Sequence, residues 1–315
     1  MNTSMKVIIA DSLSSEAVQR LRASGAQVDD RSGIEAGELA SIIGTYDGLI
    51  VRSRTKVTAD LLKSAAQLKV VGRAGVGVDN IDLAAARERG VMVVNTPVST
   101  SVAVAELTFA LLLSLLRQIP RADDSMKKGL WIKKELEGAE LSGKSLGILG
   151  VGNIGAQVAR RAAAFDMRVL GYDPLLDEKT IRARGAKPVK LEELYAQSDL
   201  VTLHLPLLPE TRGMLNKAAF DKMKWGVYLV CAARGGVIDE DALLTALNSG
   251  QAAGAALDVF GKEPPGINAL VTHPNVVTTP HIGAQTAEAQ TRAALDVAEE
   301  VLKALQGKPL RWQIK

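Results

Sequence analysis

The sequence predicts an α/β protein with two successive doubly wound parallel sheets. Short runs of β-branched and other apolar residues alternate with amphipathic stretches in both halves of the chain. Hydrophobic residues make up 47% of the chain, whereas aromatic residues make up only 3%. Small aliphatic side chains suit helices that pack closely on both faces of a parallel sheet, so the composition favours the same fold class.

The first half of the chain contains the first alternating series. Its predicted strands are residues 6–10, 47–51, 68–71 and 91–94, and its predicted helices are residues 15–23, 58–66 and 81–89. Strands that alternate with helices are joined by right-handed crossovers, which gives a parallel sheet. A loop is expected at residues 96–98.

The pattern changes at Ser101. The stretch SVAVAELTFALLLSLLRQIP predicts one long helix ended by Pro120, with another helix near residues 121–128. A second alternating series begins at Leu141. Its predicted strands are residues 145–149, 168–172, 200–204, 227–230, 253–257 and 276–278. Residues 264–273 are expected to form a long loop, and residues 285–306 a final helix.

The charge balance argues against a nucleic-acid partner. Lys and Arg number 38 against 35 Asp and Glu, a net charge of +3, and the basic residues are scattered along the chain. A few arginines could still bind a small anionic substrate.

Cys231 is the only cysteine, which excludes an intrachain disulfide and predicts a small buried side chain in a reducing compartment.

No segment predicts secretion or a membrane. The N-terminus, MNTSMKVIIADS, lacks the apolar segment of a signal peptide. The most apolar stretch, residues 102–116, carries Glu106 and is shorter than a membrane span. We therefore expect a cytoplasmic protein without a membrane partner.

Three glycines at the spacing G-x-G-x-x-G follow a predicted strand in SLGILGVGNIGAQVARR. Gly150 permits a tight turn, Gly152 lets the backbone approach a pyrophosphate, and Gly155 lets the next helix pack on the strand. The helix N-terminus presents N–H groups to the phosphates. Turn glycines without a ligand are the alternative.

Asp173 follows the next predicted strand, in RVLGYD. A carboxylate there can accept hydrogen bonds from both hydroxyls of an adenosine ribose and repels a 2′-phosphate, so NAD is preferred over NADP. The alternative is a turn-forming Asp before Pro174. We predict no metal site.

Charged residues follow three consecutive strands of the second series: Arg234, Glu263 and His281. Ligands of open α/β sheets bind beyond these strand ends. Hydride transfer to a carbonyl leaves an oxygen that needs a proton, which an imidazolium supplies. A carboxylate orients the imidazole, and a guanidinium holds a substrate carboxylate through two hydrogen bonds. Each residue alone could form a surface ion pair or cap a loop, but with the glycine turn the catalytic interpretation is favoured.

The other two histidines carry weaker signals. His204 ends a strand in TLHLPLLPE without an acidic partner, so packing beside a cofactor loop is favoured over catalysis. His273 precedes Pro274 in a loop and is expected to be structural.

Six motifs together make the chain resemble the D-isomer-specific 2-hydroxyacid dehydrogenases over almost its whole length: VVGRAGVGVDNID, LGILGVGNIGAQVA, GYDP, ARGGVIDEDAL, AALDVFGKEPP and PHIGAQT. The resemblance implies a Rossmann NAD-binding domain, residues 99–285, inserted into a flavodoxin-like substrate domain, residues 1–98 plus 286–315. It also implies closure of the two domains, which expels water before hydride transfer.

The resemblance implies roles by position. Arg234 would bind the substrate carboxylate and carbonyl, Glu263 would pair with the histidine, and His281 would be the acid and base. The implied cofactor-binding residues are Val76, Gly150, Gly152, Asn153, Ile154, Gly155, Asp173, His204, Leu205, Ala232, Ala233, Arg234, Asp258, His281, Gly283 and Ala284. Val76 stands where the family often has Thr. The implied substrate-binding residues are Arg52, Ser53, Arg73, Ala74, Gly75, Lys133, Arg234 and His281.

The similarity is strongest to members that act on a phosphorylated acid, with Arg52 and Arg73 on the phosphate and Lys133 reaching from a partner subunit. The leading hypothesis is NAD-dependent oxidation of 3-phospho-D-glycerate to 3-phosphohydroxypyruvate. The alternatives are a reductase of glyoxylate, hydroxypyruvate or sulfopyruvate, and an NADH-sensing protein like the corepressors of this fold. Arg54 is an additional cation outside the family pattern.

The family also implies a homodimer through the NAD domain. Residues 102–116 are a candidate for part of that interface, and burial in the core explains their apolar character equally well. Longer relatives carry C-terminal regulatory domains, and regulation through such a domain is not expected in this chain.

Overall fold

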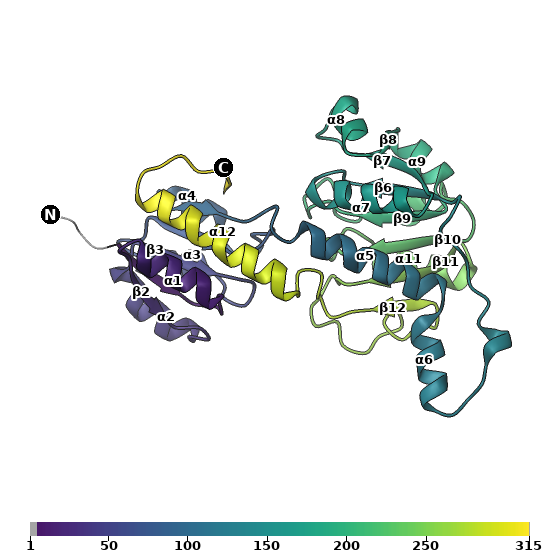
Figure 1. The fold of residues 1–315 in the computed structure, drawn as a ribbon, viewed down its shortest axis with the longest axis horizontal. Helices are drawn as coiled ribbons and strands as arrows, with labels where there is room; N and C mark the ends of the chain where they lie inside the picture. The colour runs from purple at the N-terminus through teal and green to yellow at the C-terminus, as the bar shows by residue number, and fades with distance from the viewer. Residues whose placement is uncertain (1–4, 315) are drawn as a thin grey trace. The chain divides into compact units, whose positions relative to one another are not determined.

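The computed structural model describes residues 5–314, and the chain divides into two compact units (Figure 1). The first unit comprises Met1–Thr100 and Ala284–Lys315, and the second comprises Ser101–Gly283. The first unit is therefore assembled from both ends of the chain. The start of the N-terminal segment considered above for a signal peptide, residues 1–4, lies outside the described residues.

The first unit contains a six-stranded sheet in the order β13-β5-β4-β3-β1-β2. The strands are β1 (Lys6–Ile9), β2 (Gln27–Asp30), β3 (Gly48–Val51), β4 (Val70–Arg73), β5 (Met92–Val94) and β13 (Gln313–Ile314). Strands β1 to β5 are parallel, and β13 pairs antiparallel with β5. The order 2-1-3-4-5 is that of a flavodoxin-like doubly wound sheet, so the predicted fold class is confirmed for this unit.

Helices cover both faces of the first sheet: α1 (Ser15–Ala23), α2 (Ala36–Ile42), α3 (Ala59–Ser64), α4 (Leu83–Glu88) and α12 (Ala287–Leu305), with a 3-10 turn η1 (Ile43–Thr45). Val7 and Ile9 pack in the cluster that includes α1 and α12, whereas Ile8 packs in the cluster that includes α2, α3 and α4. Because both faces are buried there, the central strands β1, β3 and β4 contain continuous rather than alternating apolar runs.

A buried carboxylate attaches the end of the chain to α12. Glu300 is fully buried and accepts hydrogen bonds from the backbone N–H groups of Arg311, at 2.7 Å, and Trp312, at 3.2 Å. Nε of Arg311 donates to the other carboxylate oxygen at 2.9 Å. Burial alone would raise the pKa of Glu300, but these hydrogen bonds lower it below its ordinary value. The result places β13 at the edge of the sheet.

The second unit contains a seven-stranded, fully parallel sheet in the order β12-β11-β10-β9-β6-β7-β8. The strands are β6 (Ser145–Leu149), β7 (Arg168–Tyr172), β8 (Lys187–Pro188), β9 (Leu200–Leu203), β10 (Val227–Cys231), β11 (Ala252–Leu257) and β12 (Val276–Thr278). Counted from β6, the order is that of a Rossmann sheet. Strands β7 and β8 are added on one side of β6 and strands β9 to β12 on the other, so the strand order reverses between β6 and β9. The predicted Rossmann fold is confirmed.

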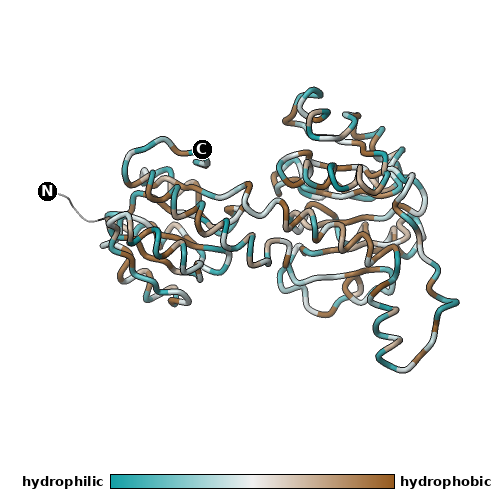
Figure 2. Tube along the Cα trace, in the orientation of Figure 1, coloured by the Kyte–Doolittle hydropathy of each residue, from teal (hydrophilic) through white to brown (hydrophobic). Residues whose placement is uncertain are grey.

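The helices of the second unit are α5 (Ser101–Leu116), α6 (Ile119–Lys127), α7 (Asn153–Ala164), α8 (Glu178–Ala183), α9 (Leu191–Gln197), α10 (Lys217–Phe220) and α11 (Glu240–Ser249), with a 3-10 turn η2 (Lys133–Glu135). Helices α5 and α7 share one core cluster with β6, and α9, α10 and α11 share the other with β9. Figure 2 shows hydrophobic residues along the strands of both units.

The predicted helix through Pro120 is wrong. Helix α5 ends at Leu116, Gln118 adopts a left-handed conformation with φ of 50°, and Pro120 lies in the first turn of α6. Proline lacks an N–H group, and the first turn of a helix leaves its N–H groups without intrahelical partners. Pro120 therefore begins the second helix instead of ending the first.

Three strands were not predicted from the sequence, namely β2, β8 and β13. Their residues are partly or fully exposed, and their sequences, QVDD, KP and QI, contain no apolar run. Each lies at the edge of its sheet, where strand residues are less buried than in the centre. The apolar pattern that identifies a buried strand is therefore missing. Backbone pairing, rather than side-chain pattern, defines them.

Ten residues of helix α5 are buried, eight of them apolar, so burial in the core accounts for most of its apolar character, while Val102 and Leu113 are each 37% exposed. Among the described residues, no single helix has the length and apolarity needed to cross a membrane. The pair α5 and α6, bent by 65°, meets that requirement only when the two are counted together. Cys231 is a free, buried cysteine, as predicted, and burial raises the pKa of its thiol to about 11.

Candidate active site

The glycine turn lies between β6 and α7, at the point where the strand order of the second sheet reverses. Gly150 has a φ of +91°, and a Cβ there would lie 2.7 Å from the carbonyl oxygen of His204. A Cβ on Gly155 would overlap the carbonyl oxygen of Gly150. By contrast, a Cβ on Gly152 would meet no heavy atom within 4 Å. The turn therefore has an open side at Gly152, as the backbone approach of a pyrophosphate requires.

Asp173 directly follows β7, beside this turn. One of its carboxylate oxygens accepts a hydrogen bond from the N–H of Val151 at 2.9 Å, and the other accepts from the N–H of Leu175 at 3.0 Å. A carboxylate oxygen accepts more than one hydrogen bond, so a ribose hydroxyl can still be bound. Asn153 and Ile154 begin α7, where the N-cap residue is Gly152. The residues present fit the adenosine and pyrophosphate groups of a dinucleotide.

Glu263 and His281 come together at the carboxyl ends of β11 and β12. Nδ1 of His281 lies 2.7 Å from Oε2 of Glu263. Oε1 of Glu263 accepts a hydrogen bond from the N–H of Phe260 at 3.1 Å, which holds the carboxylate in its loop. His281 has a left-handed backbone, with φ of 54°. With Nδ1 turned to the carboxylate, Nε2 is the ring nitrogen available to a substrate.

Asp258 anchors the loop that carries His281. It is fully buried and accepts hydrogen bonds from the N–H groups of Ile282 and Gly283, each at 2.8 Å, and from Oγ1 of Thr279 at 2.6 Å. His281 therefore lies between segments that a single carboxylate holds. The family resemblance implies a cofactor contact for Asp258 and does not predict this anchoring role, although an Asp directly after a buried strand is a signal in the sequence.

Arg234 lies in the loop between β10 and α11. Nη1 of its guanidinium donates to the carbonyl oxygen of Ala233 at 2.6 Å. A Cβ on the next residue, Gly235, would overlap the backbone of Phe260, so the loops after β10 and β11 are in direct backbone contact. Nothing larger than glycine fits between them. The structure thus brings the loops of Arg234, Glu263 and His281 to the same edge of one sheet.

His204 follows β9, and its environment keeps the imidazole neutral. Nε2 lies 3.0 Å from Oγ1 of Thr202, and Nδ1 is buried without a hydrogen-bond partner among residues 5–314. Burial lowers the pKa of His204 to about 3. A neutral imidazole does not supply the proton of an imidazolium near neutral pH, so the catalytic alternative for His204 is not supported.

Most of the other predicted site residues of the second unit are buried beside the glycine turn or in the loops that follow the strands. Leu205, Ala232 and Ala233 are buried, and Leu205 also limits the space beside Gly150. Lys133 is exposed in η2. Nδ1 of His273 accepts a hydrogen bond from the N–H of Asn275, at 3.1 Å, which agrees with a structural role in its loop.

The predicted phosphate-binding arginines share the carboxyl edge of the first sheet. Arg73 ends β4 in register with Val51 of β3, and Arg52 comes directly after Val51. Asp11, which follows β1 and is buried, accepts hydrogen bonds from the N–H of Arg52 at 2.6 Å and from Nε of Arg54 at 3.0 Å. Arg54, the additional cation, thus helps to hold the loop that carries Arg52 and the exposed Ser53.

Backbone contacts also shape the loop after β4. Nη1 of Arg73 donates to the carbonyl oxygen of Ala74 at 3.3 Å, and a Cβ on Gly75 would overlap the guanidinium. The carbonyl oxygen of Val76 accepts a hydrogen bond from Nδ2 of Asn95 at 2.6 Å. Ala284, predicted to lie near the cofactor, belongs to the first unit, where its carbonyl oxygen accepts from Nε2 of Gln290 at 2.7 Å.

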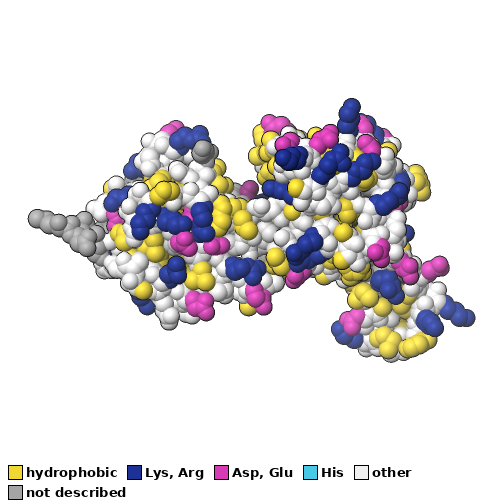
Figure 3. Space-filling model, turned by 45° about the horizontal axis from the view of Figure 1, so that its top comes forward, with side chains coloured by type: hydrophobic (Ala, Val, Ile, Leu, Met, Phe, Trp, Pro, Cys, Tyr) yellow, Lys and Arg dark blue, Asp and Glu magenta, His cyan; other side chains and the backbone are white. Residues whose placement is uncertain are grey.

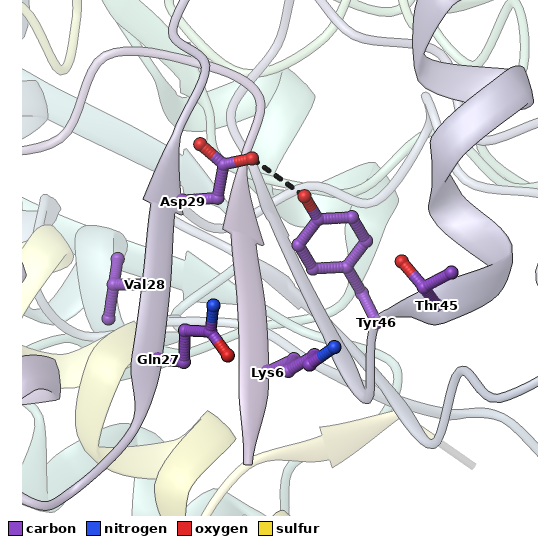
Figure 4. Close-up of a pocket in the computed structure, with 6 residues that line it drawn as sticks. All are labelled: Lys6, Gln27, Val28, Asp29, Thr45 and Tyr46. Atoms are coloured by element: carbon purple, nitrogen blue, oxygen red, sulfur yellow. Dashed lines mark hydrogen bonds between the residues drawn. The ribbon is translucent and has the colours of Figure 1, made fainter. Parts of the chain in front are cut away.

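A cavity of about 240 Å³ opens at the amino-terminal edge of the first sheet, lined by Lys6, Gln27, Val28, Asp29, Thr45 and Tyr46 (Figure 4). The hydroxyl of Tyr46 donates to Asp29 at 2.6 Å. Burial and this hydrogen bond raise the pKa of Tyr46 to about 12. The cavity lies at the opposite end of the strands from Arg52 and Arg73, and no predicted site residue lines it.

Comparison with known proteins relates the chain to one family. The family model described as "D-isomer specific 2-hydroxyacid dehydrogenase, NAD binding domain" matches residues 109–283. A D-3-phosphoglycerate dehydrogenase of Rattus norvegicus is 49% identical over 305 residues, which are 97% of this chain and 57% of that protein. One from Bacillus subtilis is 46% identical over 306 residues, 97% of this chain and 58% of that protein. The chain thus spans a little over half the length of these relatives.

Solved structures agree with the sequence matches. A protein of Thermus thermophilus is 37% identical with a TM-score of 0.87, covering 99% of this chain and 100% of that one. A glyoxylate reductase from Paecilomyes thermophila is 30% identical with a TM-score of 0.91, covering 100% and 99%. An acyclic imino acid reductase in complex with NADPH and D-Arg is 29% identical with a TM-score of 0.88, covering 99% and 100%.

The glycine turn, the strand order of both sheets and these matches lead to one conclusion: the chain belongs to the D-isomer-specific 2-hydroxyacid dehydrogenases, and the second unit carries the NAD-binding domain of that family.

Proposed function

We propose that the protein oxidises 3-phospho-D-glycerate at C2 to 3-phosphohydroxypyruvate with NAD. The observation that carries the reaction class is the pairing of His281 with Glu263 at the carboxyl edge of the coenzyme-binding sheet. The substrate is inferred from the identity of 45–49% with D-3-phosphoglycerate dehydrogenases across nearly the whole chain.

The mechanism assigns one task to each of three side chains. When bound, NAD supplies the hydride acceptor. His281 accepts the proton of the C2 hydroxyl at Nε2 as the C2 hydrogen leaves as hydride. Glu263 holds the ring through Nδ1 and stabilises the imidazolium that forms. Arg234 binds the substrate carboxylate through its guanidinium. In the reverse direction His281 donates the same proton.

The first unit supplies cations for the phosphate. Arg52 directly follows β3 and Arg73 ends the paired strand β4, and the Asp11 carboxylate orders the loop of Arg52 by accepting from its backbone N–H. A phosphate dianion forms short, charge-assisted hydrogen bonds with guanidinium groups. This arrangement favours an acid that carries a phosphate at C3 over an acid with an uncharged group there.

NAD is preferred over NADP because Asp173 places a carboxylate where the adenosine ribose is expected. Its position is held by the N–H groups of Val151 and Leu175. A 2′-phosphate beside this carboxylate would bring like charges together. We expect little activity with NADP.

A homodimer is proposed through the segment that projects from the second unit. This projecting segment, residues 117–140, contains α6 and η2 and is braced by hydrogen bonds from Arg121 to Glu135 (Figure 1). Its large apolar side chains are exposed: Ile119 51%, Met126 58%, Leu130 53% and Trp131 78%. Apolar and charged side chains mingle on its surface (Figure 3). Exposed apolar clusters of this kind mark protein interfaces.

Light scattering tests the dimer. Replacing Leu130 and Trp131 by Ser should convert a dimer to a monomer. The midpoint of thermal unfolding should fall less than it would after a substitution in the core, because both side chains are exposed. The same dimer mass in this variant would contradict the interface. The dimer would also place the exposed Lys133 against a neighbouring copy.

A panel of substrates tests the reaction. The kcat/KM for 3-phosphoglycerate should exceed that for unphosphorylated glycerate at least about 100-fold, because two charge-assisted hydrogen bonds are lost. Arg52→Ala should remove most of that preference and leave glycerate oxidation unchanged. Faster turnover of glyoxylate would instead favour the reductase alternative, which the likeness to a glyoxylate reductase supports. NADH binding without turnover of any acid would favour the NADH-sensing alternative.

A further inference from the structure

Two charged side chains hold the peptide groups of Val151, the residue between the first two glycines of the turn. Its N–H donates to Asp173 at 2.9 Å, and its carbonyl oxygen accepts from Nη1 of Arg184 at 2.6 Å. Val151 itself is fully buried. Asp173 follows β7 and Arg184 is the C-cap residue of α8, so both belong to the segment after the second strand of the Rossmann sheet.

The contact between Arg184 and the carbonyl of Val151 also determines the direction of the next N–H group, that of Gly152. In a trans peptide the carbonyl of one residue and the N–H of the next point in opposite directions. The carbonyl of Val151 points to Arg184, so the N–H of Gly152 points away from Arg184. Gly152 is also the N-cap of α7, and its Cβ position faces open space.

This peptide needs an external constraint. Glycines flank Val151, and Gly150 has a φ of +91°. Glycine has an unusually wide choice of backbone conformations, so a peptide beside glycines rotates more readily than others. A charged donor on the carbonyl of Val151 limits that rotation, since the rotated peptide would lose a charge-assisted hydrogen bond.

We propose that Arg184 is a positioning residue of the coenzyme site. It acts through the carbonyl of Val151 to aim the N–H of Gly152 at the pyrophosphate of the dinucleotide. The inference depends on NAD binding by the second unit and not on the identity of the acid that is oxidised. Its expected effect is specific: loss of Arg184 weakens the binding of ligands that contain a pyrophosphate and leaves the binding of the nucleoside alone unchanged.

Arg182 provides a matched control. It lies on the same helix and carries the same charge, but its side chain is 61% exposed and pairs with Glu178 at 3.3 Å. Removing Arg182 changes the charge near the site without touching the turn. A purely long-range electrostatic effect would therefore affect Arg182 and Arg184 variants alike.

The test measures dissociation constants of the full chain by NADH fluorescence, with ADP and adenosine as competitors. Arg184→Met should bind NADH and ADP about 10-fold more weakly, the effect of one charge-assisted hydrogen bond, and bind adenosine within about 2-fold of the original chain. Arg182→Met should change none of the three beyond about 2-fold. If Arg184→Met does not fold, Arg184→Lys, which keeps the charge on a shorter side chain, should show the same selective loss for ADP.

Three results would overturn the inference: unchanged affinity of a folded Arg184 variant for ADP, an equal loss for adenosine and ADP, or an equal loss in Arg182→Met. A chain that binds NADH but does not oxidise 3-phosphoglycerate would overturn the proposed reaction and leave this inference standing. A chain that does not bind NADH would overturn both.

Discussion

Nδ1 of His281 and Oε2 of Glu263 lie 2.7 Å apart although 18 positions separate the two residues in the chain. The parallel pairing of β11 with β12 brings the ends of both strands to one edge of the sheet, and the loops beyond them meet there. The contact fixes which ring nitrogen faces the carboxylate. It also makes the roles of the two residues separable by mutation.

His281→Gln should lower kcat for the acid about 100- to 10,000-fold, because the variant lacks a group that accepts the hydroxyl proton. The dissociation constant for NADH should change far less than kcat, since the glycine turn expected to bind the pyrophosphate is untouched. Steady-state kinetics and NADH fluorescence measure the two quantities. Glu263→Gln keeps a hydrogen-bonding group beside Nδ1 but removes its charge, so its loss in kcat should be smaller. An active His281→Gln enzyme would exclude His281 as the acid and base.

Asp258→Asn should destabilise the fold by about 1–3 kcal/mol, because an amide NH2 would replace one of two oxygens that face donors from Thr279, Ile282 and Gly283. The kcat should fall as well, since the loop of His281 loses its anchor. Urea unfolding and steady-state kinetics measure both effects. Asp221→Asn, which alters an exposed pair with Lys217, is the control and should change the stability by less than about 0.5 kcal/mol. Native stability and kcat in Asp258→Asn would refute the anchoring role.

Gly152→Ala and Gly155→Ala should separate coenzyme binding from folding. A methyl group on Gly152 faces open space, and its φ of −68° suits alanine, so the stability should change by less than about 0.5 kcal/mol. NADH should nevertheless bind at least about 10-fold more weakly, because the methyl group occupies the side that the pyrophosphate approaches. Gly155→Ala forces α7 away from the carbonyl of Gly150 and should cost about 1–3 kcal/mol of stability. Unfolding curves and NADH titrations of both variants decide the matter; tight NADH binding by Gly152→Ala would contradict the assignment of the open side.

His204 should make the fold less stable as the pH falls below about 6.5. Burial lowers its pKa from 6.5 to about 3 in the folded chain, so between these values the unfolded chain binds one more proton than the folded chain. The free energy of unfolding should therefore fall with decreasing pH, by at most about 1.4 kcal/mol per pH unit from this residue. Above pH 6.5 the residue makes no such contribution.

Urea unfolding at about pH 7.5, 6.5 and 5.5, values that bracket the ordinary pKa of histidine, measures this effect. His204→Asn removes the titrating group and should show a shallower pH dependence than the original chain. His273→Asn, which alters a histidine in a surface loop, is the matched control and should keep the original slope. Identical slopes in all three proteins would show that His204 is not held neutral by burial.

The sequence predicted the features that depend on local pattern. Continuous apolar runs such as KVII and SLGIL identify strands buried on both faces, because only helices on both sides can cover them. Gly150, Gly152 and Gly155 predicted the turn, since their spacing follows from the geometry of one strand, one turn and one helix. The charged residues after successive strands were predicted to share an edge because parallel strands point the same way.

Features that depend on partners far away in the chain were not predicted. The strands β2, β8 and β13 are defined by their neighbours in the sheet, and their own residues carry no apolar run. The anchoring roles of Asp11, Asp258 and Arg184 depend on backbone groups that other loops bring within reach. Pro120 was assigned to the wrong helix because proline stops one helix and starts another equally well.

The amino-acid sequence by itself determined the α/β class, the coenzyme turn and the identities of the residues proposed to react, because short-range periodicity and residue chemistry suffice for these. Only the tertiary structure decided the edge strands β2, β8 and β13, the ring nitrogen of His281 that faces Glu263 and the orientation of the Val151 peptide. Each of these depends on hydrogen bonds between segments distant in the chain, and such bonds form only after packing has placed the segments side by side.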